Sequence, residues 1–222
     1  MKKYAVIVAG GSGSRMNAAV PKQFMLLGGK PVLYHTLKAF LDAYIDMQIV
    51  LVLPKDHINQ GKEIVENNFF GANIEITTGG NTRFHSVKNG LGLVDNQSVV
   101  FVHDAVRCMV TPALIRKCYD AVIEHGSAVP VINTKDSIRL IKNAENIAID
   151  RNLVKLVQTP QVFFARDLIA AFNMEYRDDF TDEASVTEAF GIKIHLIEGE
   201  ENNIKITHPV DLLLAAHLIS NR

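Results

Sequence analysis

Between residues 4 and 132 the chain alternates short apolar runs with longer segments of helical periodicity, and this alternation constrains the fold more than any other feature. The runs at 4–9, 49–53, 74–77, 99–103 and 128–132 have strand length, and the segments between them predict helices at 31–44, 55–67, 83–93 and 111–125. Because most of these runs are apolar nearly throughout, we expect both of their faces to be buried. The chain therefore predicts an α/β fold, Rossmann-like, with a mostly parallel sheet between two layers of helices.

The alternation stops after Ile132. Residues 133–157 show strand-like alternation around a polar turn at 143–146, with no crossover helix between the two halves. A hairpin that hangs from an α/β domain leaves an exposed edge. We therefore expect a protruding β-arm that packs on a second subunit and makes a homodimer; the alternative is a hairpin folded on its own sheet. Helices at 166–176, 182–189 and 209–219 and a strand at 193–197 complete a single domain, 1–222.

The composition excludes several classes of protein. With 23 basic and 24 acidic side chains the net charge is -1, so no global positive field is available for nucleic acid. No apolar run reaches the roughly 18 residues that a membrane span needs, and we interpret the N-terminal run as a strand, not a signal peptide. The two cysteines form no CxxC pair, and we expect both to be buried and reduced. We expect a cytoplasmic protein that binds neither nucleic acid nor membrane.

The first loop carries the clearest chemistry. It reads Ala-Gly-Gly-Ser-Gly-Ser-Arg-Met over 9–16, followed by Pro-Lys-Gln over 21–23. Glycines let successive N–H groups form a nest for an anion. The loop lacks the Gly-Lys-Ser/Thr of a Walker loop, and Met16 stands where a dinucleotide fingerprint needs a small residue. We expect a phosphate loop with two cations of its own, Arg15 and Lys22.

Other polar segments follow predicted strands, and ligands of such sheets bind at the carboxyl ends of the strands. Asp104 follows one strand; it either holds a substrate hydroxyl or a hydrated Mg²⁺, or it caps a turn and pairs with Arg107. We interpret His103 as a packed strand-end histidine, because no second histidine or carboxylate stands at metal-ligand spacing. The segment 79–86 either presents N–H groups at a helix start or is an ordinary turn. Lys205, inside a short β-like run, would by itself be a solvated lysine.

Taken together, these segments resemble the 2-C-methyl-D-erythritol 4-phosphate cytidylyltransferases, a GT-A-like family of nucleotidyltransferases of the non-mevalonate isoprenoid pathway. The resemblance covers nearly the whole chain in order, and its segments are Gly13, Arg15 and Met16 with Pro21-Lys22-Gln23, His103-Asp104-Ala105 with Arg107, Asp150-Arg151-Asn152, Thr159-Pro160-Gln161, Thr181-Asp182-Glu183-Ala184 and Asn203-Ile204-Lys205-Ile206-Thr207. The chain departs from the family pattern at Asn81, Val106 and Cys108. These departures bear on fine substrate contacts and not on the reaction.

The resemblance implies transfer of CMP from CTP to 2-C-methyl-D-erythritol 4-phosphate, which gives 4-diphosphocytidyl-2-C-methyl-D-erythritol and pyrophosphate. The attacking phosphate is already an anion, so the reaction needs positioning and fixed positive charge and no general base. Mg²⁺ would be carried mainly by the CTP phosphates, and the protein ligands of the metal stay unknown.

The resemblance also assigns roles to residues. Arg15 and Lys22 would stabilise the transition state at the triphosphate, while Lys205 and Arg151 would hold the methylerythritol phosphate in line, with Arg151 acting across the dimer interface. The nucleotide-binding positions would be Ala9, Gly10, Gly11, Gly13, Gly80, Asn81 and Ser86, and the substrate-binding positions Asp104, Arg107, Thr134 and Thr159.

Two other functions remain open at this point. A ribitol 5-phosphate cytidylyltransferase shares the fold and the reaction, although the stretch Arg-Phe-His-Ser-Val over 83–87 favours the methylerythritol enzymes. A nucleotide-binding regulatory module without catalytic activity would have lost Arg15 or Lys22, and both are present. The failed dinucleotide fingerprint argues against a dehydrogenase.

Overall fold

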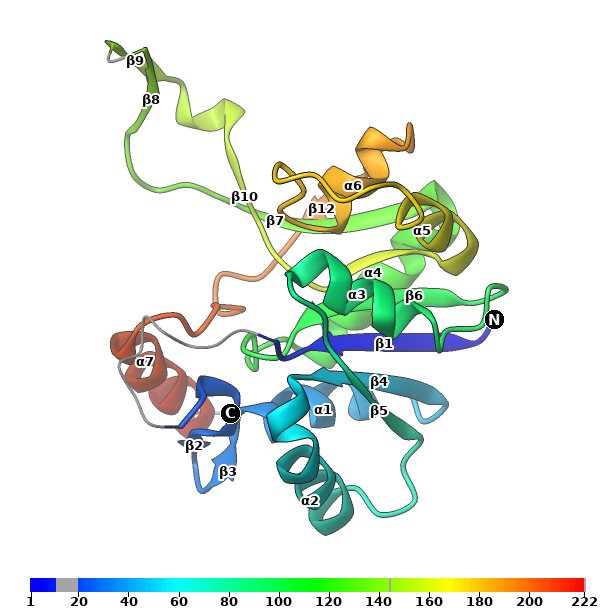
Figure 1. The fold of residues 1–222 in the computed structure, drawn as a ribbon. Coiled ribbons are helices and arrows are strands. Elements are labelled where there is room, and N and C mark those ends of the chain that lie inside the picture. Colours follow the sequence, from blue (N-terminus) through cyan, green and yellow to red (C-terminus); the bar gives the residue numbers. More distant parts are fainter. Residues whose placement is uncertain (11–19, 144, 222) are drawn as a thin grey trace.

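In the computed structural model of the protein, residues 1–10, 20–143 and 145–221 are described. Among them, one large sheet has the strand order β10-β7-β11-β6-β1-β4-β5, and β12 pairs with β7 (Figure 1). The central strands run parallel to one another. They are β1 (Lys3–Val8), β4 (Met47–Leu53), β5 (Ile74–Thr78) and β6 (Val99–Asp104). The predicted mostly parallel sheet is thereby confirmed.

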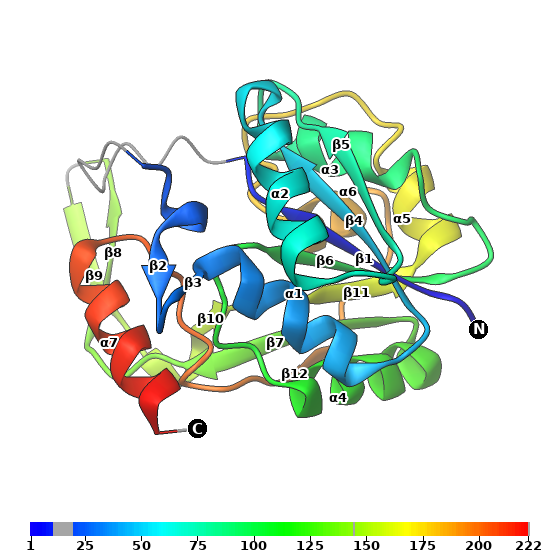
Figure 2. The ribbon, with the colours of Figure 1, turned by 90° about the horizontal axis from the view of Figure 1, so that it is seen from below.

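Helices cover both faces of this sheet. One face packs against α1 (Val32–Ala43), α2 (Ile58–Asn68) and α4 (Pro112–His125), and the other against α3 (Arg83–Leu91), α5 (Ala165–Ala171) and α6 (Glu183–Ala189). Figure 2 shows α1 and α2 over the first face. Alternate residues of β1 serve the two cores, since Ala5 and Ile7 pack in one and Val6 and Val8 in the other. The α/β/α layering follows from strands that are apolar on both sides.

Helix α3 lies unusually close to the sheet, and a glycine permits this. A Cβ added at Gly90 would lie 2.6 Å from Cγ1 of Val6 and 2.9 Å from Cγ2 of Val52. The first turn of the helix is capped by Thr82, whose hydroxyl accepts the N–H of His85. The close contact holds the C-terminal part of α3 against β1 and β4, and the cap fixes the start of the helix.

The far side of the sheet differs from the sequence prediction. Strand β11 (Gln161–Phe164) was not predicted; it runs antiparallel between β6 and β7 (Ser127–Asn133). The helix predicted at 166–176 ends at Ala171, and beyond this end Phe172 and Phe180 stack on Phe84. The strand predicted at 193–197 is β12 (Leu196–Glu198), which pairs parallel with β7.

The segment 133–157 forms an arm that stands away from the body of the molecule (Figure 1). Its hairpin consists of β8 (Ile138–Lys142) and β9 (Glu145–Ile149), which pair only with each other within the described residues. The chain then returns through a short 3-10 turn, η4 (Arg151–Leu153), to β10 (Lys155–Val157), which pairs antiparallel with β7. Within the described residues β8 and β9 pair with no strand of the main sheet, while packing of the arm on a second subunit stays a prediction.

The remaining elements are small or terminal. The turn η2 (Lys22–Phe24) leads into the ribbon β2 (Leu26–Leu27) and β3 (Lys30–Pro31), η3 (Lys55–His57) precedes α2, and α7 (Pro209–Ser220) packs beside β2. Cys108 and Cys118 are both buried, as predicted. No helix in the described part of the chain is long and apolar enough to cross a bilayer.

Candidate active site

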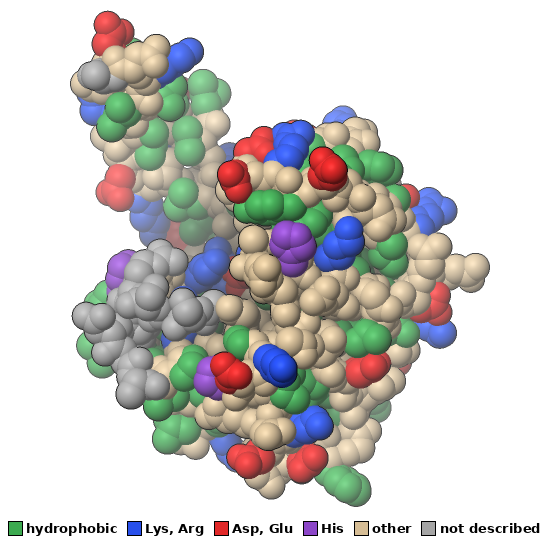
Figure 3. All heavy atoms as spheres, in the orientation of Figure 1, with side chains coloured by type: hydrophobic (Ala, Val, Ile, Leu, Met, Phe, Trp, Pro, Cys, Tyr) green, Lys and Arg blue, Asp and Glu red, His purple; other side chains and the backbone are tan. Residues whose placement is uncertain are grey.

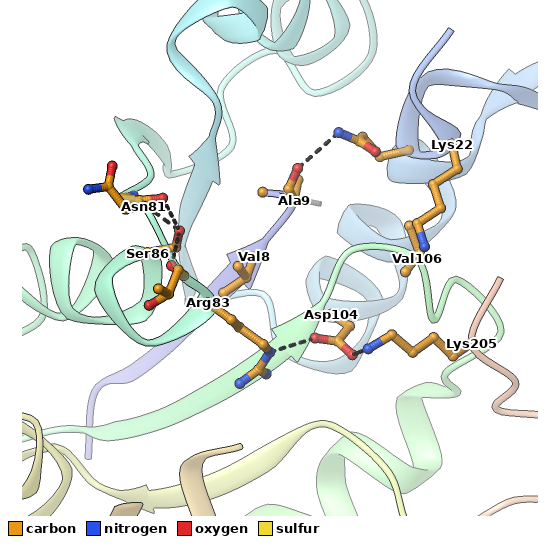
Figure 4. Close-up of a pocket in the computed structure, with 13 residues that line it drawn as sticks. Val8, Ala9, Lys22, Asn81, Arg83, Ser86, Asp104, Val106 and Lys205 are labelled. Atoms are coloured by element: carbon orange, nitrogen blue, oxygen red, sulfur yellow. Dashed lines mark hydrogen bonds and ion pairs between the residues drawn. The ribbon is translucent and has the colours of Figure 1, made fainter. Parts of the chain in front are cut away.

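A pocket of about 240 Å³ opens where β1, β5 and β6 end (Figure 4). These are carboxyl ends of parallel strands, where the sequence predicted ligand binding. The pocket is lined by Val8, Ala9, Gly10, Lys22, Gln23, Gly80, Asn81, Thr82, Arg83, Ser86, Asp104, Val106 and Lys205.

The end of β1 and the turn η2 are tied together by a buried glutamine. Nε2 of Gln23 donates to the carbonyl oxygen of Ala9 over 2.9 Å, and only 1% of Gln23 is exposed. Pro21 opens the turn, and its carbonyl accepts the N–H of Phe24. This arrangement places Lys22 in the pocket wall. The predicted residues Gly11, Gly13 and Arg15 lie outside the described part of the chain.

The segment 80–86 forms the opposite wall and ends in the N-terminus of α3. The N–H of Gly80 donates to Oγ of Ser86 over 3.1 Å, and that hydroxyl donates to the carbonyl of Thr82 over 2.9 Å. Only glycine fits at position 80, because a Cβ there would lie 2.5 Å from Cβ of His85 and 3.1 Å from its carbonyl carbon. The pocket thus receives the positive end of the helix beside Asn81, which suits an anionic ligand.

Asp104 is the only carboxylate in the described wall of the pocket, and cations surround it. Its Oδ2 lies 2.7 Å from Nζ of Lys205, and its Oδ1 lies 3.1 Å from Nε of Arg83 (Figure 4). Nε of Arg107 lies 3.9 Å from Oδ2. Burial by itself raises the pKa of the Asp104 carboxyl, but the charges of Arg83 and Lys205 outweigh it and hold that pKa well below its ordinary value. Asp104 is therefore an anion at neutral pH.

A chain of hydrogen bonds beneath the pocket fixes the backbone of Asp104. Nε2 of His103 lies 3.1 Å from the carbonyl oxygen of Arg107, which can only accept, so Nε2 carries the proton. Nδ1 then accepts from the hydroxyl of Thr159 over 3.0 Å, and that hydroxyl accepts the N–H of Asp104 over 3.1 Å. Burial lowers the pKa of His103 to about 3, so the ring is neutral. The prediction of a packed strand-end histidine is confirmed.

Arg83 has a second carboxylate partner that the sequence analysis did not include among the site residues. Its Nη1 lies 2.5 Å from Oε1 and its Nη2 3.1 Å from Oε2 of Glu183, a side chain with no exposed surface. The negative charges of Glu183 and Asp104 raise the pKa of Arg83 against the effect of burial. Glu183 belongs to the Thr-Asp-Glu-Ala segment noted in the sequence, which was the available signal.

Three of the predicted substrate-binding positions, and also Arg151, do not line this pocket. Arg107 donates to the carbonyls of Asn203 and Val157, over 2.9 and 3.3 Å, and Thr159 is buried with its hydroxyl engaged by Asp104 and His103. Thr134 and Arg151 lie at the base of the arm. There Nη1 of Arg151 donates to the carbonyl of Lys135, the residue after Thr134, over 2.8 Å. The structure thus brings Thr134 and Arg151 near each other but not into the pocket of their own subunit.

Nothing in the described residues resembles a preformed metal cage. Among them, no three or more histidine, cysteine, aspartate or glutamate side chains are grouped so that they could hold a metal ion. Both oxygens of Asp104 are already within hydrogen-bond distance of a cation. A metal in this pocket would need most of its oxygen ligands from a bound substrate.

Comparison with known proteins places this geometry in context. The family model of 2-C-methyl-D-erythritol 4-phosphate cytidylyltransferase matches residues 4–221. Enzymes of that name from Bacteroides thetaiotaomicron and Porphyromonas gingivalis (strain W83) are 46% and 44% identical to this chain; each alignment covers 99% of it, and 100% and 99% of the relatives.

Two solved structures are similar over nearly their whole length. The 4-diphosphocytidyl-2C-methyl-D-erythritol synthase from Anaerococcus prevotii gives a TM-score of 0.85 at 29% identity, with 98% of each chain covered. The 2-C-methyl-D-erythritol 4-phosphate cytidylyltransferase from Thermus thermophilus gives 0.77 at 31% identity, with 97% of this chain and 98% of the other covered.

Proposed function

The chain belongs to the 2-C-methyl-D-erythritol 4-phosphate cytidylyltransferase family, and from this premise we propose that its pocket joins CTP to 2-C-methyl-D-erythritol 4-phosphate. A phosphate oxygen of the polyol phosphate bonds to the α-phosphorus of CTP, and the bond from that phosphorus to the β-phosphate oxygen breaks to release pyrophosphate. The enzyme is a CTP-dependent cytidylyltransferase of isoprenoid biosynthesis. The comparisons do not favour the ribitol phosphate alternative, because the relatives are named for the methylerythritol substrate.

One observation carries the proposal for this pocket. Lys22 and Lys205, far apart in the sequence, line the same cavity together with the N-terminus of α3, in a protein whose net charge is -1. Two polyanions must meet in this reaction, and negative charge moves onto the departing pyrophosphate. Fixed cations and N–H groups in a concave site meet that requirement without a covalent nucleophile.

The two sides of the pocket suit different substrates. We assign the nucleotide to the wall made by the end of β1 and the segment 80–86, where Ala9, Gly10, Gly80, Asn81 and Ser86 lie. Lys22, together with Arg15, would stabilise charge on the triphosphate. The polyol phosphate would occupy the side of Asp104 and Lys205. For Arg107 and Thr159, direct substrate contact stays a prediction, and their described contacts support a role in holding the segment around Asp104.

The arm supports a homodimer. Leu140, Ile141 and Ile147 on its hairpin are 49%, 76% and 57% exposed, and Leu153 at its base is 81% exposed. Figure 3 shows apolar side chains spread over the visible face of the arm. Each Å² of such apolar surface that a partner covers stabilises the dimer by about 25 cal/mol. We propose that the arm packs on a second copy and that Arg151, with Thr134 beside it, completes the partner's pocket.

Mg²⁺ is part of the proposal as a companion of the nucleotide. When bound, it would neutralise triphosphate charge and polarise the α-phosphoryl group. The single carboxylate in the described wall, Asp104, fits a metal held mainly by CTP phosphates. A cytoplasmic location also stays a prediction.

The test is a substrate screen. Pyrophosphate release is measured with CTP, ATP, GTP and UTP, each with 2-C-methyl-D-erythritol 4-phosphate or ribitol 5-phosphate as acceptor. We expect turnover with CTP and the methylerythritol substrate, at a kcat/KM at least about tenfold above every other pair, since one well-made polar contact discriminates by that much or more. Preference for ribitol 5-phosphate, or release with no acceptor dependence, would contradict the proposal.

A further inference from the structure

The proposed reaction gives no role to Glu183, although this residue holds Arg83 firmly. Both carboxylate oxygens of Glu183 accept from the guanidinium group, at 2.5 and 3.1 Å, in a fork-to-fork arrangement. Nε, the third donor position, reaches Oδ1 of Asp104 at 3.1 Å. The three side chains therefore form one hydrogen-bonded network, which extends from a buried site at the start of α6 into the pocket.

Stability by itself is a poor explanation for Glu183. The side chain is wholly buried, and burial raises the pKa of its carboxyl against the opposing charge of Arg83. Taking such an ion pair out of water offsets most of the attraction between its members, so a buried pair is weak evidence for stability. An arrangement of this kind is better explained by the geometry that it enforces.

The position of Glu183 is itself fixed from two sides. Its helix is capped by Asp182, which accepts the N–H of Ser185. Gln161 on β11 donates to Asp182 and accepts the N–H of Ala184, over 2.8 Å in each case. Because Gln161 pairs in register with Val102 of β6, two residues before Asp104, the start of α6 is tied to the strand that carries the pocket carboxylate.

The two oxygens of Asp104 have different partners. Oδ2 contacts Lys205, whose side chain is 41% exposed and which we assign to the polyol phosphate. Oδ1 contacts Nε of Arg83, whose Nη1 and Nη2 each donate to Glu183. When a substrate phosphate binds Lys205, Arg83 still fixes the plane of the Asp104 carboxylate.

We propose that Glu183 is a positioning residue for the polyol phosphate. It acts through Arg83, which orients the Asp104 carboxylate toward the substrate hydroxyl groups. Nε, Nη1 and Nη2 of Arg83 each donate to a carboxylate, which supports its role in positioning Asp104. This inference rests on the proposed function, and its test separates the two.

The experiment compares steady-state kinetics for both substrates in four variants and one control variant. Glu183→Gln keeps the shape of the side chain but points an amide N–H₂ toward the guanidinium group. Arg83→Gln and the double variant complete a cycle, and Arg83→Lys keeps the charge without a fork that can span two carboxylates. Thr187→Val is the matched control, because Thr187 is buried on the same helix and its hydroxyl contacts only backbone carbonyls of Glu183 and Ala184.

We expect Glu183→Gln to lower kcat/KM for the methylerythritol substrate by about 10-fold to 100-fold, the usual consequence of a small misplacement. The KM for CTP should change by less than about 3-fold, within the scatter of independent sites. The double variant should lose no more than Arg83→Gln alone, and Thr187→Val should leave both KM values unchanged.

Distinct results overturn the inference. If Glu183→Gln leaves kcat/KM for the methylerythritol substrate unchanged, shifts both KM values equally, or adds to Arg83→Gln, then Glu183 has only a structural role. Should Glu183→Gln fail to fold, Arg83→Lys decides, and normal kinetics in that variant also overturn the inference. A wild-type enzyme without turnover overturns the proposed function and this inference with it, whereas active wild type beside a normal variant overturns this inference alone.

Discussion

His103 makes the stability of the protein depend on pH below about 6.5. The ring is wholly buried, and its pKa is lowered from the ordinary 6.5 to about 3, mainly by burial. Below pH 6.5 the unfolded chain takes up a proton on this ring, and the folded protein does not. The sign is therefore fixed: the contribution of His103 is fully present above pH 6.5 and is lost as the pH falls toward 3.

The magnitude follows from the size of the shift. Each pH unit below the unfolded pKa removes about 1.4 kcal/mol, so a fall from pH 6.5 to pH 5 removes about 2 kcal/mol from the free energy of unfolding. Asp104 adds nothing in this window, because its lowered pKa affects stability only below its unfolded pKa of 3.8. Glu183, with a raised pKa, acts in the opposite sense, and a comparison of two proteins that both contain it cancels its effect.

The comparison is between the wild type and His103→Gln. A glutamine amide can still donate to the carbonyl of Arg107 but does not titrate. Urea unfolding is measured at pH 7 and at pH 5, and we expect the stability advantage of the wild type to shrink by about 2 kcal/mol between them. A constant difference between the two proteins would refute the reasoning, as would a His103 ring that titrates near pH 6.5 in the folded state by NMR.

Three further predictions concern activity. Lys22→Ala should lower kcat by about 10²–10³ with an unchanged circular dichroism spectrum, since it removes a fixed charge at the triphosphate; near-normal turnover would disprove its role. Gly80→Ala should raise the KM for CTP well above that for the polyol phosphate, because the new Cβ would lie 2.5 Å from Cβ of His85 and push the loop out of place; equal effects on both substrates would argue against a nucleotide wall there. Inactive Arg151→Ala and inactive Lys22→Ala proteins should regain part of their activity when subunits are exchanged; no recovery would mean that the arm serves its own subunit.

Much of the sheet could be predicted because its strands are apolar on both faces. Val6 and Ile7 are neighbours in β1 and both are wholly buried, which only a strand covered on two sides allows. Strand β11 could not be predicted in the same way. It is four residues long, begins with the polar Gln161 and runs directly into α5, so no periodicity marks it. It becomes a strand because β6 and β7 offer it an edge on each side.

The site, like the sheet, could be predicted only in part. The loops after Ala9 and after His103 were predictable, since the carboxyl ends of neighbouring parallel strands must meet. The contacts among Arg83, Asp104 and Glu183 were not, because they depend on how α3, β6 and α6 approach one another in three dimensions. A short motif can show that each residue is present, but it does not show which of them share a hydrogen bond.

The acidic residues of this site are best understood as supports for its cations. Lys205 and Arg83 would repel each other at a common pocket, and the Asp104 carboxylate between them, at 2.7 and 3.1 Å, lets both stay there without a ligand. Glu183 compensates for the charge of Arg83 on the buried side. The positive charge that remains available is then concentrated where phosphate oxygens enter, and little reorganisation is needed when they do. A protein of net charge -1 can in this way present a cationic cavity to two polyanions, because its buried carboxylates hold the cations in position.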